Sequence, residues 1–111
     1  MRTMLPGLSL LLALSCVCAP AALALDEAGS EALMRKSGCF KCHAIDKKKD
    51  GPSYKELAAK WKGKPDAMDK LTTHITTSPK VKIEGKEEDH EALKSKDPAD
   101  VKSVVNWVLS R

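Results

Sequence analysis

Two cysteines and a histidine lie within five consecutive residues of this chain. The segment reads Cys39-Phe40-Lys41-Cys42-His43. This C-x-x-C-H pattern is the attachment sequence of c-type haem. Two thiols at this spacing can add to the two vinyl groups along one edge of a porphyrin, and the imidazole that follows is then held beneath the iron as its axial ligand. The motif therefore predicts one covalently bound haem c, attached through Cys39 and Cys42, with His43 as an iron ligand.

Three other uses of the same residues compete with this interpretation. A thioredoxin-like redox pair follows a strand in a strand–helix–strand unit, and no strand is predicted before Cys39. A zinc site needs four ligands at recognisable spacings, and His74 and His90 are too far apart in the sequence to form a convincing second pair. A disulfide between Cys39 and Cys42 stays open, although it would close only a small loop.

The first 24 residues have the composition of a cleaved export signal. Arg2 supplies a positive start, residues 8–17 form a nearly unbroken apolar run, and residues 22–24 give a small-x-small cleavage pattern. The run is shorter than the roughly 20 apolar residues that a membrane-spanning helix needs. We therefore expect a signal peptide over residues 1–24, a single domain over residues 25–111, and a periplasmic protein without a stable membrane anchor after cleavage.

The segment after the predicted signal keeps two cysteines and a modest positive charge. Cys16 and Cys18 leave with the signal, so Cys39 and Cys42 are the cysteines that remain. The segment retains 18 of the 19 basic residues and all 15 acidic ones, a formal charge of +3. Because acidic residues are interspersed among the lysines, we expect no nucleic-acid binding, which needs a concentrated basic surface.

Gly and Pro residues divide this segment into four predicted helices. The predicted helices are residues 26–37, 53–62, 66–77 and 97–109, and residues 78–96 are predicted to be a polar loop without regular structure. The first helix has acidic residues at its start and basic residues at its end, as the helix dipole favours. No segment shows a sustained alternation of apolar and polar residues, so the pattern predicts an all-α domain.

The last predicted helix has the clearest apolar face. Its apolar residues at i, i+3, i+4, i+7 and i+8 are Val101, Val104, Val105, Val108 and Leu109. The other predicted helices add few large apolar side chains to the core, since the whole chain has only two Trp, one Phe and one Tyr. Domains of this size are marginally stable unless something supplements the core. A buried haem would add apolar surface for the helices to cover, so the thin core supports a prosthetic group.

The segment around the motif resembles the short bacterial monohaem class I cytochromes c, which are periplasmic electron carriers. The stretch GCFKCHAIDKKKDGPSYKELAAKWKG carries the resemblance, and DPADVKSVVNWVLS resembles the C-terminal helix of that family. The resemblance implies a small class I cytochrome c fold, in which about four helices wrap around one covalently bound haem. It also implies that the first and last helices cross and pack together.

The resemblance assigns positions and roles to several residues. The contact between the first and last helices would involve Leu33 and Gly38 on one side and Val104 and Trp107 on the other. In the family, the carbonyl of the Pro in a Gly-Pro pair after the motif accepts a hydrogen bond from the proximal His.

That pair is Gly51-Pro52 here, so the resemblance implies that the carbonyl of Pro52 accepts a hydrogen bond from His43.

His74 lies in the predicted helix where relatives tend to carry a basic residue that meets a haem propionate. That role suits His74 better than iron ligation.

The second axial ligand of the family, a Met shortly before the last helix, is missing from this chain. Outside the predicted signal the methionines are Met34, which precedes the motif, and Met68, which core packing explains. His90 lies 17 residues before Trp107, within one position of the family's Met. We therefore predict bis-histidine iron ligated by His43 and His90. Its potential should lie below that of Met-ligated relatives, because imidazole in place of a thioether lowers the haem potential.

Other distal arrangements stay open at this stage. The iron ligand could instead be Met68 or a lysine of the predicted loop, although an ammonium must first lose its proton. The loop lysines in question are Lys80, Lys82 and Lys86. An open distal position is a further alternative. The acidic residues beside His90, which are Glu87, Glu88, Asp89 and Glu91, would favour the oxidised haem.

These residues together predict a single-electron carrier rather than an enzyme, because no set of acid, base and nucleophile accompanies the motif. A lysine-rich haem edge would dock onto acidic surfaces of redox partner proteins. Its lysines are Lys41, Lys47, Lys48 and Lys49. We expect the protein to act as a monomer. The alternative function is a haem protein that binds or senses a small ligand at an open or labile distal site, and a haem-free dithiol oxidoreductase is a third.

Overall fold

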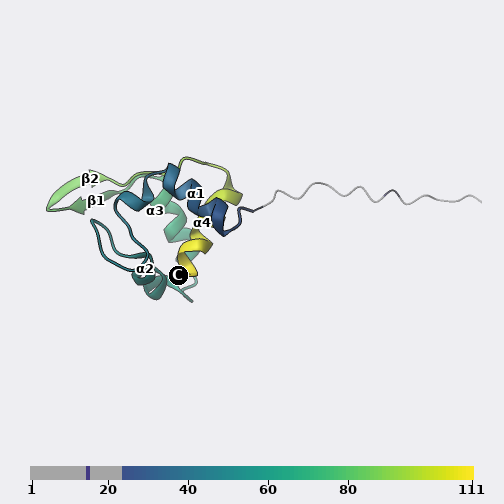
Figure 1. Ribbon diagram of the computed structural model, residues 1–111, viewed down its shortest axis with the longest axis horizontal. Helices are drawn as coiled ribbons and strands as arrows, with labels where there is room; N and C mark the ends of the chain where they lie inside the picture. Colours follow the sequence, from purple (N-terminus) through teal and green to yellow (C-terminus); the bar gives the residue numbers. More distant parts are fainter. Residues whose placement is uncertain (1–14, 16–23) are drawn as a thin grey trace, which may run out of the picture.

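The computed structural model describes Ser15 and residues 24–111, so nearly all of the predicted signal peptide (residues 1–24) lies outside the described residues. The described elements, in chain order, are α1 (Glu27–Lys36), η1 (Cys39–Lys41), α2 (Tyr54–Trp61), α3 (Ala67–Thr76), β1 (Lys80–Ile83), β2 (Lys86–Asp89) and α4 (Pro98–Leu109). Figure 1 shows α4 running through the middle of the molecule with α1 and α3 beside it. The prediction of an all-α fold with four helices is confirmed. Within the described residues, no helix has the length and apolar character needed to span a membrane.

Side-chain caps start three of the four helices where the sequence places Asp or Ser. Asp26 accepts the backbone N–H of Gly29 at 2.7 Å, and Ser53 accepts that of Glu56 at 3.1 Å. Asp97 accepts the N–H of Ala99 at 3.0 Å and is followed by Pro98, which needs no hydrogen bond in the first turn. Each cap satisfies one of the backbone N–H groups that a helix start leaves unpaired.

Helix α1 ends at a residue in the left-handed region of the backbone. Gly38 has a φ of +80°, and its N–H donates to the carbonyl of Arg35 at 3.1 Å. A residue with a Cβ pays a steric cost in this conformation, which explains the glycine. The chain therefore leaves α1 sharply and enters η1 directly, so the end of the helix positions the first cysteine.

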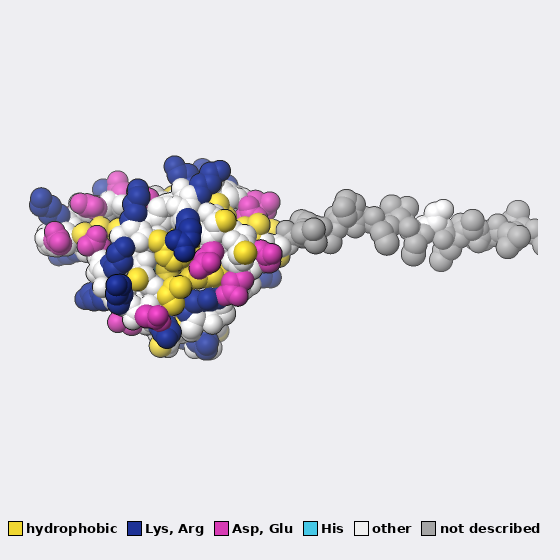
Figure 2. Space-filling model, in the orientation of Figure 1, with side chains coloured by type: hydrophobic (Ala, Val, Ile, Leu, Met, Phe, Trp, Pro, Cys, Tyr) yellow, Lys and Arg dark blue, Asp and Glu magenta, His cyan; other side chains and the backbone are white. Residues whose placement is uncertain are grey.

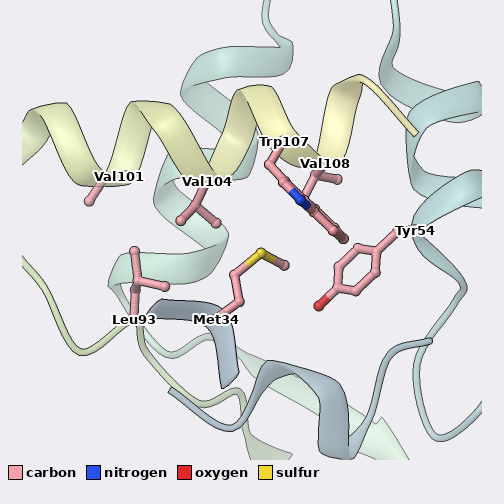
Figure 3. Packing of buried hydrophobic residues seen from close by; sticks show 7 residues of the cluster. All are labelled: Met34, Tyr54, Leu93, Val101, Val104, Trp107 and Val108. Atoms are coloured by element: carbon pink, nitrogen blue, oxygen red, sulfur yellow. The ribbon is translucent and has the colours of Figure 1, made fainter. Parts of the chain in front are cut away.

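The core lies where α1 and α2 pack against α4 (Figure 3). Met34 is 1 % exposed and lies between the valines of α4 and the ring of Tyr54. The rings of Tyr54 and Trp107 meet edge to face with centroids 5.0 Å apart. The buried residues of this cluster are Met34, Tyr54, Leu93, Val101, Val104, Trp107 and Val108. Leu33 packs against the same cluster, so the expected contact between the first and last helices is present.

The prediction that residues 78–96 form a loop without regular structure is wrong. Strands β1 and β2 pair antiparallel, with Lys80 opposite Asp89 and Ile83 opposite Lys86. Glu84 and Gly85, which join the strands, both have positive φ, as two-residue hairpins require. The hairpin points away from the helices at one end of the molecule (Figure 1).

The sequence did contain a signal for this hairpin. Val81 and Ile83 alternate with lysines and are half-buried, whereas the lysines are exposed. A glycine two residues later marks the turn. This alternation covers only four residues, and β2 has no apolar residue to repeat it, so the pattern was too short to stand out.

Candidate functional site

The motif begins on the single turn η1, which follows α1 closely, and Cys42 and His43 come directly after that turn. The N–H of His43 donates to the carbonyl of Cys39 at 3.1 Å, which folds the motif back on itself. Neither cysteine takes part in a disulfide, and both side chains are half-buried. Desolvation by burial raises the pKa of Cys39 to about 11. Reactive redox cysteines have lowered pKa values instead, so this environment disfavours the dithiol oxidoreductase.

The imidazole of His43 is held from behind by the backbone. Its Nδ1 lies 2.7 Å from the carbonyl oxygen of Pro52, which accepts its hydrogen. This is the contact that the family resemblance implied. The bond leaves Nε2 as the free ring nitrogen and fixes the orientation of the ring.

Gly51 has a spatial role that the sequence did not reveal. A Cβ at this position would lie 2.6 Å from Cε1 and 2.9 Å from Nδ1 of His43. Because no carbon can approach an imidazole so closely, only glycine lets the backbone pass under the ring. The Gly-Pro pair is therefore more than a turn: one residue makes room for the imidazole and the next orients it.

Backbone hydrogen bonds close the segment between the motif and α2. The N–H of Gly51 donates to the carbonyl of Cys42 at 2.8 Å, and that of Tyr54 donates to Ala44 at 2.9 Å. Tyr54, which sequence reasoning missed as a site residue, places its ring 5.3 Å from that of His43, centroid to centroid. Its position two residues after Gly51-Pro52 was the available signal. The buried Tyr54 ring links the motif to the core.

His90 lies close to His43 in the structure, although 47 positions separate the two residues in the sequence. It follows β2 directly, and its N–H donates to the carbonyl of Pro79 at 2.8 Å. The centroids of the His43 and His90 rings are 6.1 Å apart. Two imidazoles that bind one metal ion from opposite sides, with metal–nitrogen bonds of about 2 Å, have centroids about 6 Å apart. The observed separation fits a shared ion.

The side chain of His90 is half-buried and electrically neutral at neutral pH. Burial is the main reason why its pKa is lowered to about 4, and the neighbouring His74 and His43 add to the effect. A neutral imidazole has a lone pair available for a metal. Its Nδ1 is buried and finds no hydrogen-bond partner among the described residues. The ring is thus available as a ligand but is not oriented by a hydrogen bond.

His74 lies against His90, in the last turn of α3. The two ring centroids are 4.1 Å apart and the ring planes are tilted by 57°. Burial lowers the pKa of His74 as well, and His43 contributes to the shift. The structure therefore brings together all three histidines of the chain, although the sequence separates them widely.

The other candidate ligands lie in different places. Met34 is enclosed in the core, and Met68 lines a shallow groove between α3 and α4 with Thr72 and Val101. Met68 is half-buried rather than part of the buried core. The lysines of the hairpin are exposed, and Lys80 pairs with Asp89 at 2.7 Å. Across residues 24–111 no cluster of three His, Cys, Asp or Glu side chains is arranged to hold a metal ion on its own.

Charged residues near the motif are exposed and partly paired. Lys41 lies 4.0 Å from Glu91, and Lys49 donates to the carbonyl of Phe40 at 2.8 Å. Lys47 and Lys48 are exposed beside them. Figure 2 shows acidic and basic side chains interspersed around exposed apolar atoms on one face of the molecule. Exposed pairs of this kind contribute little energy, so the pair of Lys41 and Glu91 adds little to stability.

The donor set fits a haem group well. The groups that attach and ligate a c-type haem are two thiols and two imidazoles, and the site has each of them. The thiols of Cys39 and Cys42 form no disulfide, the imidazole of His43 has a hydrogen bond to a carbonyl, and the neutral imidazole of His90 lies near it. Tyr54 and Trp107 provide aromatic surface next to the motif, and Phe40 contacts both.

Comparison with known proteins also indicates a haem group in this protein. The family model described as cytochrome c matches residues 27–111. The chain belongs to the cytochrome c family. As a member, it carries a covalently bound haem c with its iron and serves as an electron carrier, so these two predictions are confirmed.

Solved structures share the fold of this cytochrome. The class 1 cytochrome MtoD from Sideroxydans lithotrophicus ES-1 is 46 % identical, with a TM-score of 0.72 over 78 % of this chain and 97 % of that chain. Cytochrome c552 of Nitrosomonas europaea is 28 % identical, with a TM-score of 0.56 over 72 % of this chain and 96 % of that one. The predicted class I cytochrome c fold is thereby confirmed.

Relatives in sequence are cytochromes of similar size. Cytochrome c-551 of Azotobacter vinelandii is 36 % identical over 87 residues, which cover 76 % of this chain and 98 % of that protein. Cytochrome c-551 of Pseudomonas aeruginosa is 47 % identical over 45 residues, 40 % of this chain and 43 % of that protein. The second match thus spans less than half of the Pseudomonas protein.

Proposed function

We propose that this cytochrome is a periplasmic single-electron carrier whose haem is attached through Cys39 and Cys42 and ligated by His43 and His90. The observation that carries the proposal is the 6.1 Å separation of the two ring centroids, which leaves room for one iron between them. When bound, the haem supplies a one-electron couple between ferric and ferrous iron. The protein's residues set the potential of that couple through the ligands they provide.

The proximal side of the proposed site favours the oxidised iron. Pro52 accepts the hydrogen on Nδ1 of His43 at 2.7 Å, which makes the opposite nitrogen a stronger donor. A second imidazole at His90 stabilises ferric iron more than a thioether does. The potential is therefore expected to lie below that of Met-ligated relatives.

The surroundings of the site support electron transfer rather than catalysis. Exposed lysines flank the motif and would dock weakly onto acidic partner proteins. Lys41, Lys47, Lys48 and Lys49 are exposed, and acidic residues such as Glu91 lie among them, which suits weak, rapidly reversed contacts better than a tight complex. We infer a monomeric carrier without enzymatic activity, exported by a signal peptide over residues 1–24.

Spectra of the purified holoprotein and two variants test this function. The wild type should show six-coordinate low-spin bands that do not change under carbon monoxide. His90→Ala should open the distal position and bind carbon monoxide in the ferrous form. His90→Met should restore six-coordination and raise the midpoint potential in a redox titration.

Two results would contradict the proposal. If the wild type bound carbon monoxide at once, the protein would belong with the haem proteins that bind small ligands. If His90→Ala kept the wild-type spectrum and potential, His90 would not be the ligand. The midpoint potential of His90→Met is compared with that of the wild type. A higher potential in His90→Met shows that the imidazole of His90 lowers the potential of the wild type.

A further inference from the structure

The two imidazoles of the proposed site differ in what orients them. His43 is fixed by its hydrogen bond to the carbonyl of Pro52 at 2.7 Å. His90 lacks an equivalent bond, because its Nδ1 is buried without a partner among the described residues. Metal-binding histidines usually use the second ring nitrogen for such a bond, which sets the direction of the ring. Packing against neighbouring side chains is therefore the contact among the described residues that bears on the orientation of the His90 ring.

The side chain in position to restrict the rotation of the His90 ring is His74. Its ring centroid lies 4.1 Å from that of His90, closer than the 6.1 Å between the His43 and His90 centroids, and the planes are tilted by 57°. Contacts of this length are van der Waals contacts, and a tilted pair of aromatic rings limits the angles that either ring can adopt.

The backbone around the two rings is also tied together. The N–H of Leu93 donates to the carbonyl of Ile75 at 2.8 Å, and the N–H of His90 donates to the carbonyl of Pro79 at 2.8 Å. Leu71 is buried and Ile75 packs on the core, so α3 presents His74 from a firmly packed helix. The end of α3 and the segment after β2 thus form one unit in which His74 has a defined position.

We propose that His74 is a positioning residue for His90: its ring holds the His90 imidazole in the orientation in which it binds the iron. This role differs from the contact with a haem propionate that the family resemblance implied for His74. It rests on the proposed ligation by His90. The ring acts by shape, so a phenyl group should replace it.

The variants His74→Ala and His74→Phe separate the two roles in the holoprotein. Ferric low-spin electron paramagnetic resonance reports the orientation of the axial imidazoles, and cyanide binding to the ferric protein reports how often the distal bond opens. His74→Ala should broaden or shift the low-spin signal. It should also speed cyanide binding about two- to tenfold, the range for loss of one aromatic contact. His74→Phe should keep both properties close to those of the wild type.

Thr73→Ala is the matched control, because Thr73 is exposed on the same turn of α3 and should change neither readout. His74→Ala replaces a half-buried residue in a helix with a strong helix former, and circular dichroism checks that the fold is kept. The positioning role would be overturned if His74→Ala had the wild-type low-spin signal and the wild-type rate of cyanide binding. The same holds if its midpoint potential were the only property that changed. If His74→Phe behaved like His74→Ala, a shape-based role would likewise be wrong.

The spectrum of the wild type keeps this test separate from that of the proposed function. A wild type without the spectrum of bis-imidazole iron removes the ligation by His90, and the role of His74 with it. A wild type with that spectrum, combined with an unchanged His74→Ala, removes the role of His74 alone.

Discussion

The two sides of the proposed iron site are built in different ways. On the proximal side, the two cysteines, His43 and Pro52 lie within 14 consecutive residues, and short-range backbone hydrogen bonds close the segment. On the distal side, His74 and His90 are 16 residues apart in the sequence, with a whole hairpin between them. One side is a local motif, and the other depends on how separate segments pack.

This difference would allow the distal ligand proposed here to differ from the family's Met while the attachment site stays the same. The proximal ring is held by backbone groups of its own segment, so a change on the other side does not reach it. Among the contacts of the distal segment with the helices is Leu93, whose side chain is buried in the core and whose N–H donates to the carbonyl of Ile75. An exposed hairpin precedes it and can vary without disturbing the core.

The largest effect is expected from removing both thiols that attach the haem on the proximal side. Cys39→Ser combined with Cys42→Ser should yield an exported protein with the mass of the bare polypeptide. It should also lose most of its helical circular dichroism, because the small core is not stable alone. Mass spectrometry and far-ultraviolet circular dichroism measure the two results.

The control for this pair is Cys16→Ala with Cys18→Ala, which lie in the predicted signal. If that signal is cleaved, the control should release a mature protein with the same mass as the wild type. A haem-bearing product from the double serine variant would show that the cofactor is held in another way.

An intermediate effect is expected from Gly51→Ala, which leaves the attachment intact but crowds the proximal ring. The added Cβ would lie 2.6 Å from Cε1 of His43, so the imidazole or the backbone must move. Overpacking of this kind costs about 1–3 kcal/mol. Thermal unfolding of the holoprotein should show a lower midpoint, and the bands that report axial ligation should shift. An unchanged midpoint with unchanged bands would mean that this segment adapts more easily than its hydrogen bonds indicate.

The smallest effect is expected from a matched pair of glycine substitutions. Gly85 in the hairpin and Gly63 after α2 have φ of +77° and +79°, and an added Cβ would contact nothing within 4 Å at either position. Gly85→Ala and Gly63→Ala should therefore carry a similar backbone cost of about 1 kcal/mol. If the hairpin positions His90, only Gly85→Ala should speed cyanide binding to the ferric protein. Equal rates in the two variants would show that the hairpin and the distal ligand are independent.

The helices and the attachment motif could be predicted because the signals are local. Asp26, Ser53 and Asp97 cap the helices at the predicted starts, and Gly38 ends α1 where a positive φ is needed. The hairpin was missed because its apolar alternation covers only Val81 and Ile83. Likewise, Gly51 looks like an ordinary turn residue until the ring above it is known.

The sequence alone determined the chemistry of this protein: two thiols and an imidazole at the haem-attachment spacing, and four helices to surround the group. The tertiary structure decided how the distal side is built, because it brings His43, His74 and His90 together and leaves Met34 and Met68 elsewhere. Spacing along a chain can predict contacts within a turn or two of a helix. Contacts across the core depend on how α3, the hairpin and α4 pack, and no local pattern encodes that arrangement.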